Sequence, residues 1–361
     1  MVRARMKRLL FILLPALLLG ACGTPGGSAG SGQPAAASPA AEDSPATGQG
    51  SSGTLIVYSG RNEQLIGPLV EQFRSATGID LQVKYGDTAE LAQTILDEGQ
   101  HSPADIFFAQ DAGALGALQK ENRLQPLPEE FLQRVDARFR SDTGHWVGVS
   151  GRARVVVYNT KVLTETDLPE TIFGFTDPQW KGRLGWAPTN GSFQSFVTAL
   201  RKLEGEERAR EWLTGIQANQ PKVYPNNMAI VQAVGAGEID AGFVNHYYLF
   251  RALKEHGEAF PARNYFLKNG DPGALVNVAG VALLDTAKHG DAARRFIDFL
   301  LSREAQQYFA DQTYEYPLIE GVQPNPLLPP LSEIQAPQID LSDLDDLQGT
   351  LKLLQDTGVL P

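Results

Sequence analysis

The spacing of apolar residues between positions 54 and 109 changes repeatedly between strand and helix periods. Apolar runs at 55–58 and 104–109, the second interrupted by Asp105, are typical of buried strands, and alternation over 79–85 predicts a half-buried strand. Helical spacing separates these strands, with apolar residues at Ile66, Leu69, Val70, Phe73, Leu91, Ile95 and Leu96. This β-α-β-α-β order predicts a largely parallel sheet covered by helices. Ligands of such sheets bind beyond the carboxyl ends of the strands, which here are followed by loops 59–62 and 110–112.

A second region with alternating strand and helix signals follows a long strand-like segment. The segment 146–159 has strand character interrupted by Gly151, and it is a candidate crossing between two lobes. A strand at 184–187 then leads through a small polar loop, 189–193, into a helix. The N–H groups at a helix N-terminus suit an oxyanion, although a well-capped helix without a ligand has the same pattern.

The segment 241–250 reads as a short buried strand that runs directly into a helix. Asn245 stands where an N-cap is expected, which places His246, Tyr247 and Tyr248 in the first helical turn. A free tyrosine has a pKa of about 10, and a bound trivalent cation lowers it far below that value. Two adjacent phenols at this point are therefore either candidate metal ligands or half-buried aromatics that pack a helix start.

The last third of the chain predicts a return to the first lobe. The segments 271–276 and 280–284 read as this return, and a helix at 291–301 packs there. Residues 321–341 are rich in Pro and Leu and predict an extended segment. A final amphipathic helix is predicted from Leu344, Leu347, Leu351 and Leu354.

The N-terminus has the pattern of a lipoprotein leader. A basic start and an apolar stretch too short to span a bilayer end at Cys22, which is the chain's one cysteine. We expect residues 1–21 to be a signal peptide and Cys22 to be the lipidated residue, giving an extracytoplasmic protein held to a bacterial membrane. Residues 22–53, mostly Gly, Ser, Ala and Pro, predict a flexible linker.

Length, charge and motif content exclude several classes of function for the chain. The 361 residues suffice for two domains, and the formal net charge of −11 disfavours nucleic-acid binding. The sequence has no nucleophile elbow, Walker loop, dinucleotide fingerprint or zinc-protease motif, so we expect no enzymatic activity. A secreted hydrolase using cleft carboxylates is the alternative from a different class.

Seven short motifs, taken in order, resemble the ferric-ion-binding extracytoplasmic solute-binding proteins of ABC importers. These are VYSGR (57–61), PADIF (103–107), SGRARV (150–155), WKG (180–182), NHYY (245–248), DPGAL (271–275) and YPL (316–318). The resemblance implies an α/β, periplasmic-binding-protein-like fold of type II, with two lobes that close on the metal about a hinge. We assign residues 54–152 and 278–361 to the N-terminal lobe and 153–277 to the C-terminal lobe.

The resemblance also implies a set of iron contacts. Tyr247 and Tyr248 match the family's metal-binding pair, and phenolate oxygen suits the hard Fe(III) ion. Asn62 stands where several members have a ligand histidine, and Gln110 stands where they have a ligand glutamate. Both remain candidate metal contacts, but only the tyrosines supply anionic oxygen.

Two phenolates leave a trivalent ion short of charge, and the family often completes the shell with a synergistic anion such as carbonate or phosphate. The candidate anion-binding residues are Arg61, Arg152, Asn190, Gly191, Ser192, Asn227 and Asn245. For Arg152 and Arg154 a structural ion pair at the hinge is the alternative, and a ligand role for His246 is disfavoured.

The sequence thus predicts a monomeric lipoprotein that captures Fe(III) and delivers it to an ABC permease and its ATPase. The neutral residues Asn62 and Gln110 keep a second hypothesis open. In it, the same fold binds an organic or oxyanion solute, such as a phosphorylated metabolite, a polyamine or thiamine.

Overall fold

The computed structural model describes residues 53–361. The predicted signal peptide, Cys22 and residues 22–52 of the predicted linker lie outside the described residues. In the described part no helix is long and apolar enough to cross a membrane.

The first lobe contains the predicted parallel β-α-β-α-β unit. β1 pairs in parallel with β2 on one side and with β3 on the other. The elements are β1 (Leu55–Ser59), α1 (Glu63–Thr77), β2 (Leu81–Tyr85), α2 (Thr88–Glu98), β3 (Ile106–Ala109), α3 (Ala112–Lys120) and α4 (Glu129–Leu132). The loops after β1 and β3 therefore leave the same edge of the sheet, as expected for parallel strands.

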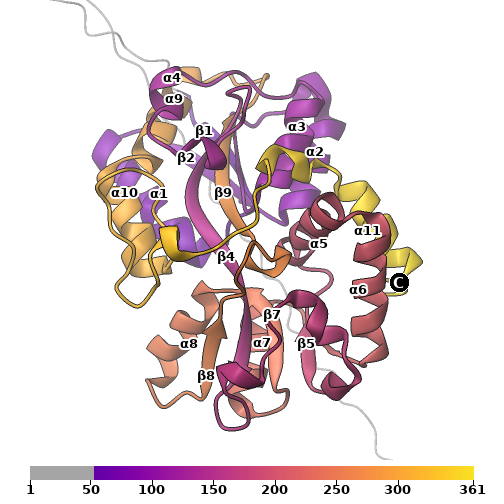
Figure 1. Cartoon of the computed structure of the whole chain (residues 1–361). Coiled ribbons are helices and arrows are strands. Elements are labelled where there is room, and N and C mark those ends of the chain that lie inside the picture. Colours follow the sequence, from indigo (N-terminus) through magenta and orange to yellow (C-terminus); the bar gives the residue numbers. More distant parts are fainter. Residues whose placement is uncertain (1–52) are drawn as a thin grey trace, which may run out of the picture. The chain divides into compact units, whose positions relative to one another are not determined.

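Two long antiparallel strands, β4 (Val147–Asn159) and β9 (Val276–Leu283), connect the lobes. The first half of β4 pairs with β9, which itself pairs with β3. The second half of β4 pairs with β7 and β8 of the second lobe, so one strand belongs to both halves of the sheet (Figure 1). The register of β4 shifts between Gly148 and Ser150. The predicted crossing at 146–159 is thus confirmed.

The second lobe surrounds the other end of β4. Its elements are β5 (Leu184–Trp186), α5 (Gly191–Glu204), α6 (Glu206–Ala218), β6 (Lys222–Val223), α7 (Asn227–Ala236), β7 (Ala241–Asn245), α8 (Tyr247–His256) and β8 (Ala262–Tyr265). The strand order through both lobes is β2-β1-β3-β9-β4-β7-β5-β6. The ends of β5 and β7 lead into α5 and α8, which places both helix starts at one edge of the sheet.

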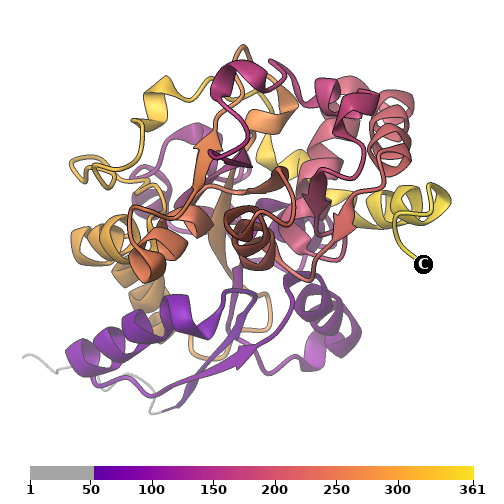
Figure 2. The same cartoon turned by 90° about the horizontal axis from the view of Figure 1, so that it is seen from below.

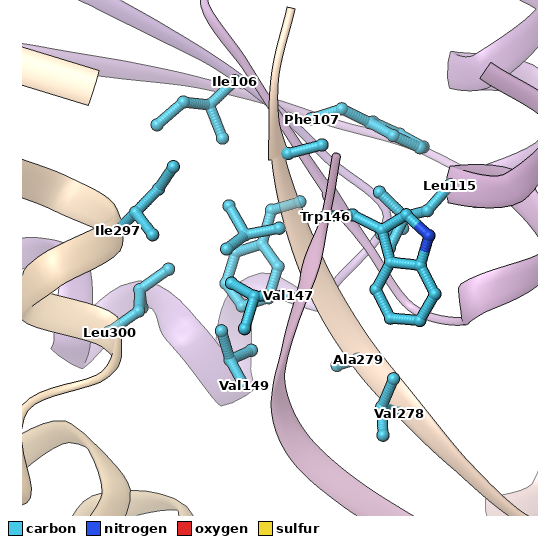
Figure 3. Close-up of a cluster of buried hydrophobic side chains, with 14 of the residues drawn as sticks. Ile106, Phe107, Leu115, Trp146, Val147, Val149, Val278, Ala279, Ile297 and Leu300 are labelled. Atoms are coloured by element: carbon cyan, nitrogen blue, oxygen red, sulfur yellow. The ribbon is translucent and has the colours of Figure 1, made fainter. Parts of the chain in front are cut away.

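Apolar side chains on both faces of the crossing strands form the core of the first lobe. Trp146, Val147 and Val149 belong to the same buried cluster as Val278 and Ala279 of β9 (Figure 3). Ile297 and Leu300 of α9 (Gly290–Leu300) cover one face of these strands. Two further apolar clusters fill the second lobe. Each lobe is thus packed largely around its own apolar side chains, while Ala199, Tyr247 and Phe250 of the second lobe pack with the first-lobe cluster.

The C-terminal segment differs from its predicted place in the first lobe. Leu341 and Leu344 pack in the first-lobe core, whereas Leu353 and Leu354 pack in the second-lobe core. The last helix, α11 (Leu347–Asp356), lies beside α5 and α6 (Figures 1 and 2). The assignment of all residues after 278 to the first lobe was wrong for this helix, because its leucines are buried by the second lobe.

Candidate functional site

A cavity of about 670 Å³ lies between residues of the two lobes. The first lobe contributes Arg61, Asn62 and Gln110, and the second contributes Asn190 and Tyr248. These five residues were predicted from distant parts of the sequence. The structure brings them to one cavity because the loops after β1 and β3 and the starts of α5 and α8 face each other.

The tyrosine pair opens α8, whose first two residues are Tyr247 and Tyr248. Their rings stack with centroids 4.2 Å apart and an interplanar angle of 29°. Tyr247 is fully buried, and its hydroxyl has no hydrogen-bond partner among residues 53–361. Tyr248 lines the cavity. A buried hydroxyl without a partner is costly, so the arrangement favours a ligand that the phenol can bind.

Burial raises the pKa of Tyr248 well above its usual value of 10, and the neighbouring Tyr247 phenol raises it further. The positive charges of Arg152 and Arg61 act in the opposite direction. The Tyr248 phenol is therefore protonated at neutral pH in the absence of a cation.

The predicted N-cap at Asn245 was wrong. Asn245 is the last residue of β7, and His246 occupies the N-cap position with helical dihedral angles. The β4–β7 pairing continues to Arg154 and Asn245, which keeps Asn245 in the strand. Its side-chain oxygen accepts a hydrogen bond from Arg154 Nη1 at 3.2 Å, so it faces the arginines and caps no helix.

Both ring nitrogens of His246 are occupied. Ala153 N–H donates to Nδ1 at 3.1 Å, so the proton lies on Nε2, which donates to the carbonyl of Tyr314 at 2.8 Å. Burial lowers the pKa of His246 to about 4. The imidazole is therefore neutral and fixed by backbone groups of both lobes, which leaves no nitrogen for a metal.

Arg61 lies at the edge of the cavity with its guanidinium buried. Its Nη2 donates to Glu315 Oε1 and Oε2 at 2.7 and 2.8 Å. Its Nε and Nη1 have no partner among residues 53–361. Sequence reasoning missed Glu315, although it lies directly before the YPL motif and is fully buried. The available signal was a carboxylate directly beside a motif residue.

Arg152 and Arg154 do not form the structural ion pair considered above. Neither makes a salt bridge to a described carboxylate, although both are buried. Arg152 Nε and Nη1 and Arg154 Nη2 lack partners among residues 53–361. Burial and the neighbouring Arg152 charge lower the pKa of Arg154 to about 9. Burial raises the pKa of the Asp111 carboxyl above its usual value. The positive charge of Arg152 acts in the opposite direction but has the smaller effect. The site therefore holds buried positive charge that an anion can compensate.

The polar loop at the start of α5 is hydrogen-bonded to Arg154. Asn190 caps α5, and its oxygen accepts from Ser192 Oγ at 2.6 Å and from Asn227 Nδ2 at 3.0 Å. Arg154 Nη1 lies 3.4 Å from Ser192 Oγ, and Asn227 Oδ1 accepts from Asn245 N–H at 2.9 Å. A continuous hydrogen-bond network thus links the first turn of α5, which begins at Gly191, to Arg154 and to Asn245, which lies two residues before the tyrosine pair.

Asn62 and Gln110 both line the cavity, with different local roles. Asn62 caps α1 by accepting from Gln64 N–H at 2.8 Å, which occupies its side-chain oxygen. Gln110 is held through its backbone, whose N–H donates to Thr88 Oγ1 at 3.2 Å. No cluster of three or more His, Cys, Asp or Glu side chains suited to a metal occurs in the described part of the chain. Of the four predicted metal contacts, only the two phenols can supply anionic oxygen.

Known proteins resemble the chain along most of its length. A family model described as bacterial extracellular solute-binding protein matches residues 101–341. The major ferric iron-binding protein of Neisseria meningitidis is 36% identical over 311 residues, which cover 84% of this chain and 93% of that protein. The Fe(3+)-binding periplasmic protein of Serratia marcescens is 31% identical over 308 residues, which cover 85% and 90%.

Solved structures of ferric-iron-binding proteins also resemble this chain over most of its length. The crystal structure of iron-bound HitA from Pseudomonas aeruginosa has a TM-score of 0.81 and 37% identity, covering 84% of this chain and 99% of that one. The predicted two-lobe α/β fold of the type II periplasmic-binding-protein class is therefore confirmed.

Proposed function

Because the chain belongs to the family of bacterial extracellular solute-binding proteins, among relatives that bind ferric iron, we propose that it captures Fe(III) together with a synergistic anion. The observation that carries the proposal is the Tyr247 hydroxyl, which is buried without a described partner beside Tyr248 at the cavity wall. Tyr247 and Tyr248 bind the ion as phenolates, and Asn62 and Gln110 face it across the cavity as neutral groups.

Charge balance explains the need for an anion. Fe(III) bound by two phenolates keeps one positive charge, and it sits beside three buried arginines of which only Arg61 has a carboxylate in salt-bridge contact. Carbonate or phosphate, held by Arg152, the Asn190–Ser192 turn, Asn227 and Asn245, offsets this positive charge. Arg61 adds its unpartnered Nη1 to the same anion. Guanidinium groups suit both anions because they donate several parallel hydrogen bonds.

The remaining parts of the proposal follow from the N-terminal pattern and the family. The chain acts outside the cytoplasm, anchored through lipid on Cys22, and passes its iron to an ABC permease and its ATPase. It catalyses no reaction, since its task is to bind, close and release.

The neutral side chains of Asn62 and Gln110 on the cavity wall favour a second candidate function, the binding of a different solute. Two amides in place of charged ligands suit a polar organic or oxyanion solute in the same cleft. In that case the buried arginines hold the anionic group of the solute, and no metal binds.

A visible spectrum of the purified protein, titrated with iron salt in bicarbonate buffer, separates the two candidates. We expect a growing phenolate-to-Fe(III) charge-transfer band that is lost in Tyr248→Phe. Absence of the band, together with absence of iron by elemental analysis, would rule out the iron proposal and support the organic solute.

A further inference from the structure

A residue of the first lobe contacts the start of the helix that carries the phenols. His246 Nε2 donates to the carbonyl of Tyr314 at 2.8 Å. The Tyr314 ring stacks on Phe250, with centroids 5.6 Å apart and an interplanar angle of 24°. His246 and Phe250 are four residues apart, so they lie on one face of the start of α8. Tyr314 therefore makes both a polar and an aromatic contact to this part of the second lobe.

The same helix face carries the buried phenol. Tyr247 precedes Phe250 by three residues, and both side chains pack in the first-lobe apolar cluster although their helix belongs to the second lobe. Tyr248 is partly buried against that cluster. The contact with Tyr314 thus helps to set how the phenol-bearing end of α8 meets the first lobe.

Tyr314 itself has an uncommon backbone conformation. Its φ of 58° and ψ of 28° lie in the left-handed region, which disfavours residues with bulky side chains. It follows the π-helical turn Phe309–Thr313, and its N–H donates to the carbonyl of Phe309. A strained residue persists only where its surroundings hold it, and the contacts to His246 and Phe250 do so here. Such strain is typical of segments that support a functional site.

The next residue, Glu315, connects Tyr314 to the cavity. Its carboxylate accepts from Arg61 Nη2 at 2.7 and 2.8 Å and from Ser150 Oγ at 2.9 Å. Arg61 lines the cavity, and its Nε and Nη1 have no partner in the described part of the chain. An anion that binds these N–H groups fixes the guanidinium, which in turn holds Glu315. Tyr314 and Glu315 therefore form a two-residue link between Arg61 and α8.

We propose that Tyr314 is a positioning residue for the iron site. It holds the start of α8, and with it the two phenols, against the first lobe, and an anion at Arg61 strengthens this contact through Glu315. The inference rests on the proposed function, since iron and its anion are the ligands that the link retains. Its consequence is that iron leaves slowly for as long as the anion is bound.

The test measures the rate at which the purified protein loses iron to an excess of a competing chelator. The phenolate-to-Fe(III) band reports the loss, at low and at high bicarbonate. Tyr314→Asn removes the ring and introduces a residue type that tolerates the left-handed conformation. We expect it to release iron about twofold to tenfold faster than wild type, the size expected for losing one aromatic pair. Bicarbonate should slow release strongly in wild type and weakly in Tyr314→Asn, and Tyr314→Phe, which keeps the ring, should behave as wild type.

Two further variants separate this role from a general loss of packing. Phe260→Ala removes a ring that stacks on His256 at the other end of α8, with centroids 5.3 Å apart, and should release iron as wild type does. Phe250→Ala removes the partner of the Tyr314 ring. Its effect combined with Tyr314→Asn should therefore be smaller than the product of the two single effects.

Three results would overturn the proposal. Release from Tyr314→Asn at the wild-type rate would show that the ring does not retain iron. A double variant whose effect equals the product of the single effects would show that the two rings act independently. An equal effect of bicarbonate on Tyr314→Asn and wild type would remove the link to Arg61. Absence of the phenolate band in wild type is a different failure, because it removes the proposed function on which the link depends.

Discussion

Arg61 Nη2 donates to both carboxylate oxygens of Glu315, at 2.7 and 2.8 Å, and neither side chain is exposed to solvent. Glu315 also accepts from Ser150 Oγ of the crossing strand at 2.9 Å. It follows Tyr314, a non-glycine residue with φ 58° at the end of the π-helical turn Phe309–Thr313. The Glu315 carboxylate therefore links the loop after β1 and the crossing strand β4 to the segment that follows the π-helical turn.

Glu315→Gln should destabilise the protein by about 3 kcal/mol, because the buried Arg61 loses its compensating charge. Its iron affinity should fall as well, since Arg61 is no longer held at the cavity edge. Urea unfolding and iron titration measure the two effects. The matched control is Asp298→Asn, which breaks the exposed pair with Arg134 and should cost at most about 1 kcal/mol. A loss in Glu315→Gln no greater than in the control would contradict the role of this pair.

Tyr247→Phe should have opposite effects on stability and on iron. The substitution removes a buried hydroxyl that has no described partner, so the free energy of unfolding of the metal-free protein should stay unchanged or rise by about 1 kcal/mol. The charge-transfer band should weaken or vanish. In the control Tyr316→Phe, the lost hydroxyl donates to Pro329 O at 3.0 Å, so stability should fall by about 1 kcal/mol with the band retained. An unchanged band in Tyr247→Phe would exclude Tyr247 as a ligand.

The low pKa of His246 predicts that the folded protein loses stability in mild acid. Its pKa is about 4 in the folded protein and about 6.5 in an unfolded chain. The unfolded state thus binds more protons, so stability is complete above pH 6.5 and falls as the pH drops toward 4. Between pH 7 and pH 5 the loss should be about 2 kcal/mol from this group.

Unfolding curves at the two pH values test this expectation in wild type and in His246→Gln, where the His246 contribution should vanish. His256→Gln on the exposed end of α8 should keep the wild-type dependence. An equal pH dependence in His246→Gln and wild type would assign the acid sensitivity to other groups.

Asn62→His combined with Gln110→Glu should strengthen iron binding and reduce its dependence on added bicarbonate. The two residues line the cavity opposite Tyr248, and the new side chains add a nitrogen ligand and a negative charge to the ion. Affinity measured by competition with a chelator, with and without bicarbonate, gives both quantities. Gln64→Glu adds the same charge elsewhere on the cavity wall and should not change the bicarbonate dependence. An unaltered dependence in the double variant would place these residues outside the coordination shell.

Several elements were predictable because their signals are local. The parallel unit of β1, β2 and β3 followed from apolar periods, and a helix start after the polar loop 189–193, where the structure has Asn190 as the cap of α5, followed from residue types suited to helix starts. Asn245 has the same residue type, yet its place was decided by pairing between β4 and β7. A capping preference is worth about 1 kcal/mol, so a continuing strand ladder overrides it.

The sequence by itself determined the two α/β halves, the long crossing strand and the adjacency of two phenols at a helix start, since periodicity and residue type act over a few positions. Only the tertiary structure decided which charges meet. Arg61 is separated from Glu315 by 254 residues, and Leu353 packs in the second lobe although the chain had already returned to the first. Arg152 and Arg154 make no salt bridge to any residue between 53 and 361 for the same reason: partners in a buried site are chosen by the packing of distant elements, which no local pattern encodes.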